Sequence, residues 1–239
     1  MQATWQSKKG TTNNENQDRA LVDPELGLFV VADGLGGYEG GATASAIAVS
    51  CINEFFRTEL PKFSDLQALV LSSIDYANSA IRTLAVERDN MRQMATTVVV
   101  AAVRHVELII ANVGDSRAYL LKYGRLKKVT RDHSAAADLT GKRLFSGKQS
   151  RIRTSRNILT MALGSSSNVR PAVFRSTVND FDQLLLCTDG LWSVLEDDVI
   201  ERTLAEDGNL LEKCRNLVSL AERNGATDDI TCVLIDISR

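Results

Sequence analysis

The sequence predicts an α+β fold, and three observations lead to this expectation. Several segments rich in β-branched and other apolar residues lie between turn residues, which is typical of strands. Four segments carry apolar residues at helical spacing. The strands and helices come in blocks instead of alternating strictly, which favours α+β over a doubly wound parallel sheet. No repeat, low-complexity tract or proline-rich linker divides the chain, so we expect one domain over residues 1–239.

The predicted strands cover 28–32, 96–103, 107–112, 118–122, 183–187 and 230–237. A short polar link around Arg104 and His105 joins the strands at 97–103 and 107–112. Another tight turn is predicted at Tyr123-Gly124-Arg125. Links this short join antiparallel neighbours, so we expect these strands to pair antiparallel.

Two long helices are predicted early in the chain, at 41–60 and 64–88. Ser64, which Asp65 follows, is a candidate N-cap for the second helix. Two more helices are predicted at 195–206 and 208–224. The apolar positions that define the long pair are Ile47, Cys51, Ile52 and Phe55, then Leu66, Leu69, Val70, Ile74, Ala77, Ile81 and Leu84.

Composition excludes several classes of protein. A net charge of -2 argues against a general nucleic-acid binder, which carries a marked basic excess. No apolar run approaches the ~20 residues of a membrane span, and the polar N-terminus lacks the apolar stretch of a signal peptide. The four cysteines are widely spaced, without a C-x-x-C pair, and are interpreted as reduced core residues. We therefore expect a cytoplasmic protein that binds neither nucleic acid nor membrane.

A basic segment at 139–156 contains six Lys or Arg residues and no acidic residue. Its two glycines and weak periodicity predict a loop. It is either a solvated surface loop or a recognition loop for an acidic partner, with Lys148, Arg151 and Arg153 as candidate docking residues. Phe145 is its one aromatic residue, which disfavours a role in nucleic-acid binding.

Five short motifs place acidic residues in turns next to predicted strands. Asp33 and Asp189 each follow an apolar strand and precede a glycine, whereas Asp228 and Asp229 stand just before a strand. Any one of these motifs is also typical of an ordinary turn. If the strand ends converge, however, the carboxylates repel each other unless cations neutralise them, and oxygen ligands select Mg²⁺ or Mn²⁺. The motifs are NENQD (14–18), ADGLGG (32–37), NVGDSR (112–117), CTDGLW (187–192) and ATDDIT (226–231).

In order and spacing, these motifs resemble those of the PP2C-type (PPM) metal-dependent protein phosphatases in their compact bacterial form. The resemblance runs from Gly10 to Ile237 and includes MATT (94–97), RDHS (131–134) and RNILTMALG (156–164). It implies two antiparallel sheets packed as a sandwich and flanked by helix pairs, an α-β-β-α arrangement. This agrees with the blocks of strands and helices described above.

The resemblance also implies roles for individual residues. Asp33 is expected to bridge two cations, with the Gly34 carbonyl on one of them. Asp189 and Asp228 are expected to bind the other. Asp33, Asp189 and Asp228 are therefore the candidate catalytic residues, and the expected cofactor is Mn²⁺ or Mg²⁺, two per chain.

Two further aspartates complete the implied site. Asp18 resembles the residue that orients metal-bound waters, and Asp115 resembles the ligand of a third, weaker cation shared with Asp189. Two cations ~3.5–4 Å apart lower the pKa of a shared water towards ~7. The implied reaction is in-line attack of the resulting hydroxide on phosphorus.

The chain departs from the family at the residue that grips the substrate phosphate. Asn13 stands where an arginine is common, and an amide supplies neither the charge nor the bidentate fork of arginine. Arg19, Lys8, Lys9 or the basic segment could compensate, and the sequence leaves this choice open. Asp229 stands where an asparagine is common, which adds a negative charge beside Asp228.

Two functions are compatible with these observations. The first is an enzyme that hydrolyses phosphoserine and phosphothreonine in proteins and opposes a bacterial Ser/Thr kinase. The second is a phosphoprotein-binding pseudophosphatase or regulatory module on the same fold, suggested by the weakened phosphate site at Asn13. The full aspartate set favours the enzyme, because a binding module does not need a crowded metal cluster.

Overall fold

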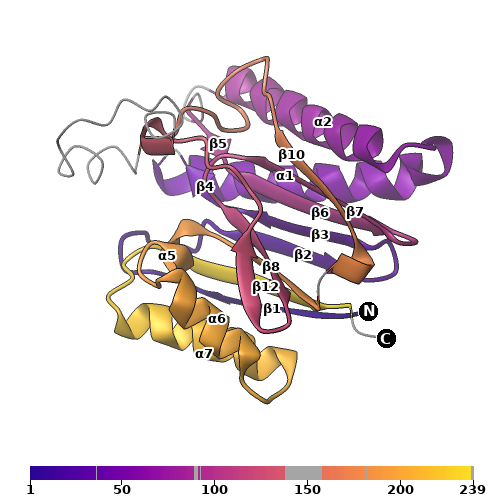
Figure 1. Ribbon diagram of the computed structural model, residues 1–239. Coiled ribbons are helices and arrows are strands. Elements are labelled where there is room, and N and C mark those ends of the chain that lie inside the picture. The colour runs from indigo at the N-terminus through magenta and orange to yellow at the C-terminus, as the bar shows by residue number, and fades with distance from the viewer. Residues whose placement is uncertain (36, 89–90, 92, 138–157, 181, 238–239) are drawn as a thin grey trace, which may run out of the picture.

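The computed structural model describes residues 1–35, 37–88, 91, 93–137, 158–180 and 182–237 (Figure 1). The basic segment at 139–156, with its candidate docking residues Lys148, Arg151 and Arg153, lies outside the described residues. None of the helices in the described part of the chain combines the length and the apolar character that a membrane span requires.

Two five-stranded sheets form the centre of the structure, and all neighbouring strands in them are antiparallel. The first sheet has the order β1 (Gln2–Lys8), β12 (Ile230–Asp236), β11 (Gln183–Cys187), β8 (Arg117–Lys122), β9 (Arg125–Lys128). The second has the order β10 (Ala172–Thr177), β7 (Glu107–Val113), β6 (Val98–Arg104), β3 (Leu28–Ala32), β2 (Arg19–Asp23). A short pair, β4 (Gly34–Leu35) with β5 (Ala95–Thr96), lies beside them.

Strand β3 shows why the sheets stack with helices outside. Successive side chains of a strand point to opposite faces. Phe29 and Val31 therefore pack between the two sheets, whereas Leu28 and Val30 pack under the helices. Because both of its faces are buried, the strand is apolar throughout.

Helices cover the outer face of each sheet (Figure 1). The long helices α1 (Gly37–Glu59) and α2 (Leu66–Glu87) pack over the second sheet. Helices α5 (Asp189–Trp192), α6 (Asp197–Ala205) and α7 (Leu210–Arg223) pack over the first. Two short 3₁₀ helices, η1 (Leu60–Lys62) and η3 (Val178–Asp180), also lie in the described part of the chain. The predicted α-β-β-α sandwich is thus confirmed.

Most of the elements predicted from the sequence are present, with ends within a few residues of those expected. The turns around His105 and Tyr123 are tight hairpins in which both residues have positive φ, 57° and 50°. The predicted N-cap at Ser64 is wrong by one residue: Asp65 is the cap, because its carboxylate accepts a hydrogen bond from the Gln67 N–H at 2.9 Å. All four cysteines are free, and Cys51 alone is not fully buried.

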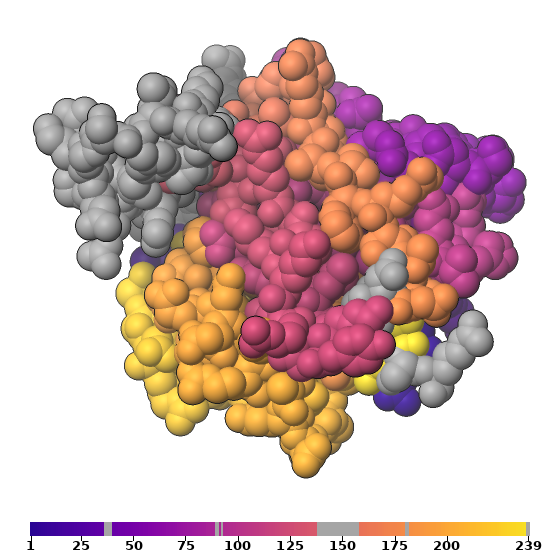
Figure 2. All heavy atoms as spheres, viewed as in Figure 1, coloured from indigo at the N-terminus to yellow at the C-terminus, as the bar shows by residue number. Residues whose placement is uncertain are grey.

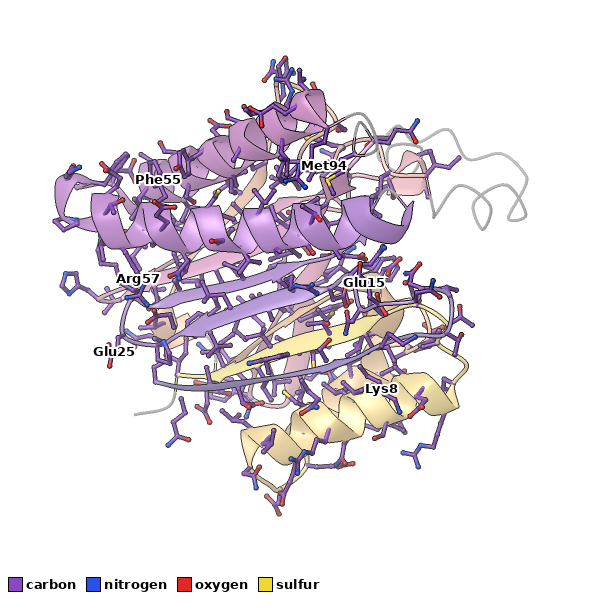
Figure 3. The ribbon with its side chains drawn as sticks, turned by 180° about the vertical axis from the view of Figure 1, so that it is seen from behind. Lys8, Glu15, Glu25, Phe55, Arg57 and Met94 are labelled. Carbon is purple, nitrogen blue, oxygen red and sulfur yellow. The ribbon has the colours of Figure 1, made fainter. Side chains whose placement is uncertain are left out.

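The hairpin formed by β8 and β9 lies on the molecular surface, beside the C-terminal helices (Figure 2). The two ends of the sandwich can be located in Figure 3, which labels Glu15 near one end and Glu25 and Arg57 at the other. The predicted acidic motifs all lie at the end that carries Glu15, as the strand pairing described next establishes.

Candidate metal centre and active site

Strand pairing brings the five acidic motifs to one end of the sandwich. Asp33 follows β3, and the end of β3 is paired with the start of β2, next to Asp18. The end of β11 leads to Asp189 and is paired with the start of β12, next to Asp228. Asp115 lies in the turn that joins the end of β7 to the start of β8. The end of β7 is paired with the start of β6, and the start of β8 is paired with the end of β11, the strand that leads to Asp189. The convergence expected from the sequence is therefore present.

Asp33 lies at the centre of this cluster. It is 9% exposed, and burial raises its pKa well above the ordinary value, with further increases from the charges of Asp18, Asp189, Asp228 and Asp115. Four neighbouring carboxylates thus act on a single buried one. Without positive charge nearby, several of these groups would have to hold protons at neutral pH.

Two carboxylate oxygens of the cluster have no hydrogen-bond partner. Asp18 Oδ1 and Asp189 Oδ1 are both buried and unpaired. The other oxygen of Asp18 accepts from Thr188 Oγ1 at 2.8 Å, yet burial still raises the pKa of Asp18 well above its ordinary value. Burial and the charge of Asp228 raise the pKa of Asp189 to about 6. An unpaired buried carboxylate oxygen is costly, and a cation would satisfy both oxygens.

The donor set fits a hard divalent cation. In the described part of the chain, no three acidic, histidine or cysteine side chains are gathered tightly enough to enclose a cation by themselves. Mg²⁺ keeps several of its waters and commonly takes only one or two carboxylates from a protein. A centre held partly through water is therefore the arrangement that these carboxylates suit.

Asp115 lies at the edge of the cluster. Burial, followed by the charges of Asp189 and Asp132, raises its pKa to about 7, although Arg117 acts in the opposite direction. It is 6% exposed. Asp115 thus interacts electrostatically with both Asp189 and Asp33.

Backbone contacts of the MATT motif fix Asp33. Its N–H donates to Thr97 Oγ1 at 3.1 Å, and its carbonyl accepts from Thr96 Oγ1 at 2.8 Å and from the Thr97 N–H at 2.9 Å. Thr97 Oγ1 also lies 2.7 Å from Ser116 Oγ, next to Asp115. The two threonines therefore link the second acidic motif to the third.

The glycines of the Asp-Gly pairs are explained by close backbone packing. A Cβ at position 34 would lie 2.2 Å from the Gly41 carbonyl oxygen, and one at position 190 would lie 2.1 Å from the Asp229 carbonyl oxygen. No side chain fits at either place. The glycines thus allow the loops to approach each other. This close packing is a second reason for glycine at these positions, besides the predicted access of a carbonyl oxygen to a cation.

Asp229 has a role that the sequence did not suggest. Its Oδ1 accepts from the Gly10 N–H and its Oδ2 from the Gln17 N–H, both at 2.8 Å. One buried carboxylate thereby closes the two ends of the loop that carries Asn13 and leads to Asp18. The signal available in the sequence was only that Asp229 adjoins Asp228.

A second charged cluster joins three of the motifs. The Arg117 guanidinium donates to Asp132 at 2.7–3.2 Å, and its Cζ lies 3.4 Å from the centroid of the Trp192 ring. Tyr119 Oη and Lys128 Nζ complete the group. Burial acts to lower the pKa of Arg117, but the hydrogen bonds and charges of Asp132 and Tyr119 together outweigh it, and the pKa lies above its ordinary value. This cluster fastens the turn of Asp115 to the helix that begins at Asp189.

The predicted phosphate-binding residues have defined surroundings. Arg19 Nη1 donates to the carbonyls of Asn16 and Asp18, both at 2.7 Å. Arg19 also lines a hollow of about 520 Å³ against α1, together with Glu15 and Met91. Asn13 offers its carbonyl to Lys9 Nζ at 2.9 Å.

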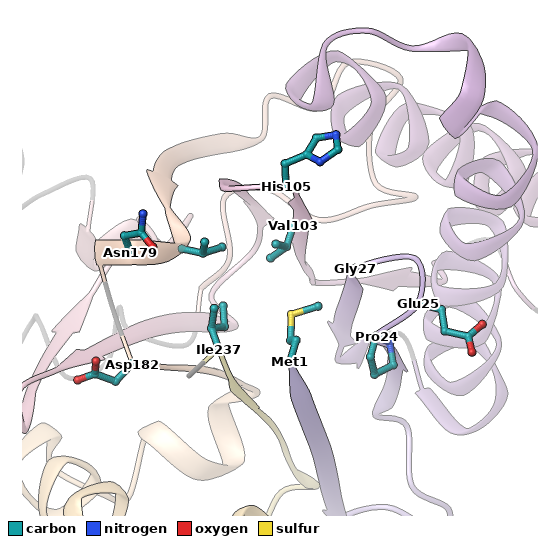
Figure 4. Close-up of a pocket in the computed structure, with 10 residues that line it drawn as sticks. Met1, Pro24, Glu25, Gly27, Val103, His105, Asn179, Asp182 and Ile237 are labelled. Carbon is teal, nitrogen blue, oxygen red and sulfur yellow. The ribbon is translucent and has the colours of Figure 1, made fainter. Parts of the chain in front are cut away.

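A separate hollow of about 490 Å³ lies at the opposite end of the sandwich (Figure 4). Its lining includes Met1, Glu25, His105 and Asp182. None of the five acidic motifs contributes a residue to it. It is therefore distinct from the carboxylate cluster.

Comparisons with known proteins agree with this geometry. A family model described as Protein phosphatase 2C matches residues 7–234. Serine/threonine phosphatase stp of Listeria welshimeri is 30% identical over 241 residues, covering 99% of this chain and 96% of that protein.

Two solved structures are similar along nearly the whole chain. Stp1 from Staphylococcus aureus superposes with a TM-score of 0.90 at 28% identity, over 99% of this chain and 95% of the other. The catalytic domain of PstP, in complex with 2 manganese ions, gives 0.85 at 25% identity, over 98% and 97% of the two chains.

Proposed function

This chain belongs to the protein phosphatase 2C family of serine/threonine phosphatases, and from this premise we propose that it hydrolyses phosphoserine and phosphothreonine in proteins by metal-assisted attack of water. The observation that carries the mechanism is the convergence of buried carboxylates, two of which have an unpaired oxygen. The substrates are then phosphorylated proteins, including those modified by a Ser/Thr kinase that this enzyme opposes.

The residues that would hold the cations follow from the cluster. Asp33 and the Gly34 carbonyl, with Asp189 and Asp228, suit two Mn²⁺ or Mg²⁺ ions, and Asp115 suits a third, weaker one. Bound there, divalent cations supply an activated water and a polarised phosphoryl group. The PstP structure with its 2 manganese ions supports this choice of metal.

The chain's own groups then position water and phosphate. Asp18 keeps one oxygen on the Thr188 hydroxyl, so its other oxygen is free to accept a hydrogen bond from water. Thr96 and Thr97 hold the Asp33 backbone still while charge develops nearby. Cys187 lies two residues before Asp189, but burial raises the pKa of its thiol above the ordinary value, so it is not suited to be a thiolate nucleophile. Direct attack by water is therefore favoured.

The alternative of a pseudophosphatase that only binds phosphoproteins is disfavoured by the energetics of the cluster. Buried carboxylates that raise each other's pKa destabilise the fold unless cations neutralise them. A binding module would gain nothing from this arrangement.

The test is hydrolysis of p-nitrophenyl phosphate and of a phosphoserine peptide with Mn²⁺ or Mg²⁺. Turnover should cease in EDTA and return when the cation is restored. Asp33→Asn should abolish turnover with the fold intact, whereas the matched control Asp207→Asn, at an exposed position, should behave as wild type. Unchanged turnover in Asp33→Asn at saturating metal would contradict the proposed role of Asp33 as a metal ligand.

A further inference from the structure

The segment from Lys9 to Gln17 links β1 to Asp18 and lies against the metal-binding end of β12. The N–H groups of Thr11 and Thr12 both donate to the Thr227 carbonyl, at 2.8 and 3.2 Å. A Cβ at position 10 would lie 2.4 Å from the carbonyl carbon of Asp228. The start of this segment therefore touches the backbone of a proposed metal ligand.

The alternation of β1 decides which side chains face the cluster. Ser7 Oγ lies 2.7 Å from Thr231 Oγ1 and accepts from Asn16 Nδ2 at 2.8 Å. A hydrogen bond from Thr231 in turn acts on Asp18, where it opposes the rise in pKa that burial causes. Ser7 thus points towards the cluster.

The next two residues point to opposite sides, as expected for an extended chain. Lys8 points away from the cluster and pairs with Glu222 of α7 at 2.6 Å (Figure 3 labels Lys8 beside this helix). Lys9 returns to the side of Ser7, where its Nζ donates to the Asn13 carbonyl at 2.9 Å. Among the described residues, no carboxylate forms an ion pair with Lys9, so its charge is free to meet an incoming anion.

Arg19 is less suited to this task. Its Nη1 is held by two backbone carbonyls, and its side chain lines the hollow beside α1. Lys8 is already neutralised by Glu222. Of the three, Lys9 has neither an ion pair, as Lys8 has, nor two backbone carbonyls on one nitrogen, as Arg19 has, among the described residues. Its single hydrogen bond holds it over the loop that contacts Asp228.

We propose that Lys9 is a phosphate-binding residue: its ammonium contacts a phosphoryl oxygen of the substrate at the rim of the carboxylate cluster. The inference rests on the proposed phosphatase function. A phosphate monoester is largely dianionic near neutral pH, and an ammonium on a flexible stem can follow the oxygens as a point charge. The hydrogen bond to the Asn13 carbonyl keeps the ammonium over the loop until an anion replaces that weaker acceptor.

The experiment compares three variants: Lys9→Met, Lys9→Arg and the matched control Lys8→Met. Calorimetry measures binding of inorganic phosphate to the Mn²⁺-loaded protein, and steady-state kinetics measure KM and kcat for p-nitrophenyl phosphate. An exposed charged contact predicts that Lys9→Met weakens phosphate binding about two- to fivefold. KM should rise by the same factor with kcat changed by less than about twofold, because the contact exists in ground and transition states alike.

Two further readouts separate charge from shape. The salt dependence of KM should become shallower in Lys9→Met, and Lys9→Arg should restore phosphate binding. Lys8→Met should match wild type in every measurement. Equal effects of the two Met variants, or unchanged phosphate binding in Lys9→Met, would overturn the proposal. Because calorimetry requires no turnover, phosphate binding that depends on Lys9 in a protein without turnover would contradict the proposed function and leave this inference standing.

Discussion

Removing the divalent cations should make the stability of this protein depend strongly on pH, and Asp115→Asn should relieve much of that dependence. In the folded chain, burial first and the charge of Asp189 next raise the pKa of Asp115 from 3.8 to about 7. The folded state therefore binds more protons than the unfolded state between these values. Since stability falls with rising pH wherever the folded state binds more protons, the metal-free protein should lose stability from about pH 4 to about pH 7.

The size of the effect follows from that interval. The pKa of Asp115 rises from 3.8 to about 7 on folding. At about 1.4 kcal/mol per pKa unit, this rise destabilises the folded state by about 4 kcal/mol above pH 7. An asparagine amide at the same place carries no charge but leaves part of its polar surface unpaired, which costs about 1–3 kcal/mol. The net gain is about 2 kcal/mol, or roughly 4–8 °C in Tm for a chain of this length.

The assay is thermal unfolding in EDTA at pH 5 and pH 8. Asp115→Asn should melt higher than wild type at pH 8 and about the same at pH 5, where most of the penalty is absent. With saturating Mn²⁺ the variant should gain less than wild type from the metal, because it lacks a ligand. Asp207→Asn, the exposed control, should shift neither curve. A metal-free Asp115→Asn that is no more stable than wild type at pH 8 would refute the reasoning.

Three other outcomes are expected. Asp229→Asn keeps one acceptor for the N–H groups of Gly10 and Gln17, so one of these amides should exchange with solvent about tenfold faster; full protection of both would be inconsistent with the loop closure described above. Arg117→Lys loses the bidentate contact and the stacking, and should lower Tm by several degrees and weaken binding of the third cation; an unchanged Tm would show that the cluster is not structural. Replacing Lys148, Arg151 and Arg153 of the basic segment with Ser should raise KM for phosphopeptides more than for p-nitrophenyl phosphate. Equal effects on both substrates would mark the segment as an ordinary surface loop.

The elements that the sequence predicts well are those buried on both faces. Strand β3 and strand β11 match their expected bounds, because an apolar run ended by Asp-Gly marks both the burial and the turn. Once those two strand ends are known, antiparallel pairing places Asp18 and Asp228 beside them. The candidate site is therefore predictable from local patterns together with one assumption about pairing.

The elements missing from the sequence-based prediction are mainly edge strands. Strand β1 (Gln2–Lys8) and strand β9 (Arg125–Lys128) each have one free edge and many polar residues, so neither shows a clear apolar pattern. Strands β2 and β10 are the edges of the other sheet. Helix α5 has only 4 residues, fewer than the helical periodicity needs to be visible.

The contacts between motifs give a structural role to residues that lie beside the aspartates but are not proposed ligands. Arg117, Asp132 and Trp192 come from three motifs, and they meet in one buried ionic and aromatic cluster that does not contain a proposed metal ligand. Breaking a buried pair of this kind leaves an uncompensated charge, which costs about 3–5 kcal/mol. The acidic motifs carry the proposed cation ligands, and this second cluster links the strand after Asp115 to the helix that begins at Asp189. A sequence pattern cannot separate the two roles, because both place charged residues next to the same turns. The contacts in three dimensions separate them: Arg117 is paired with Asp132, whereas Asp18 and Asp189 each keep an unpaired buried oxygen that suits the proposed cations.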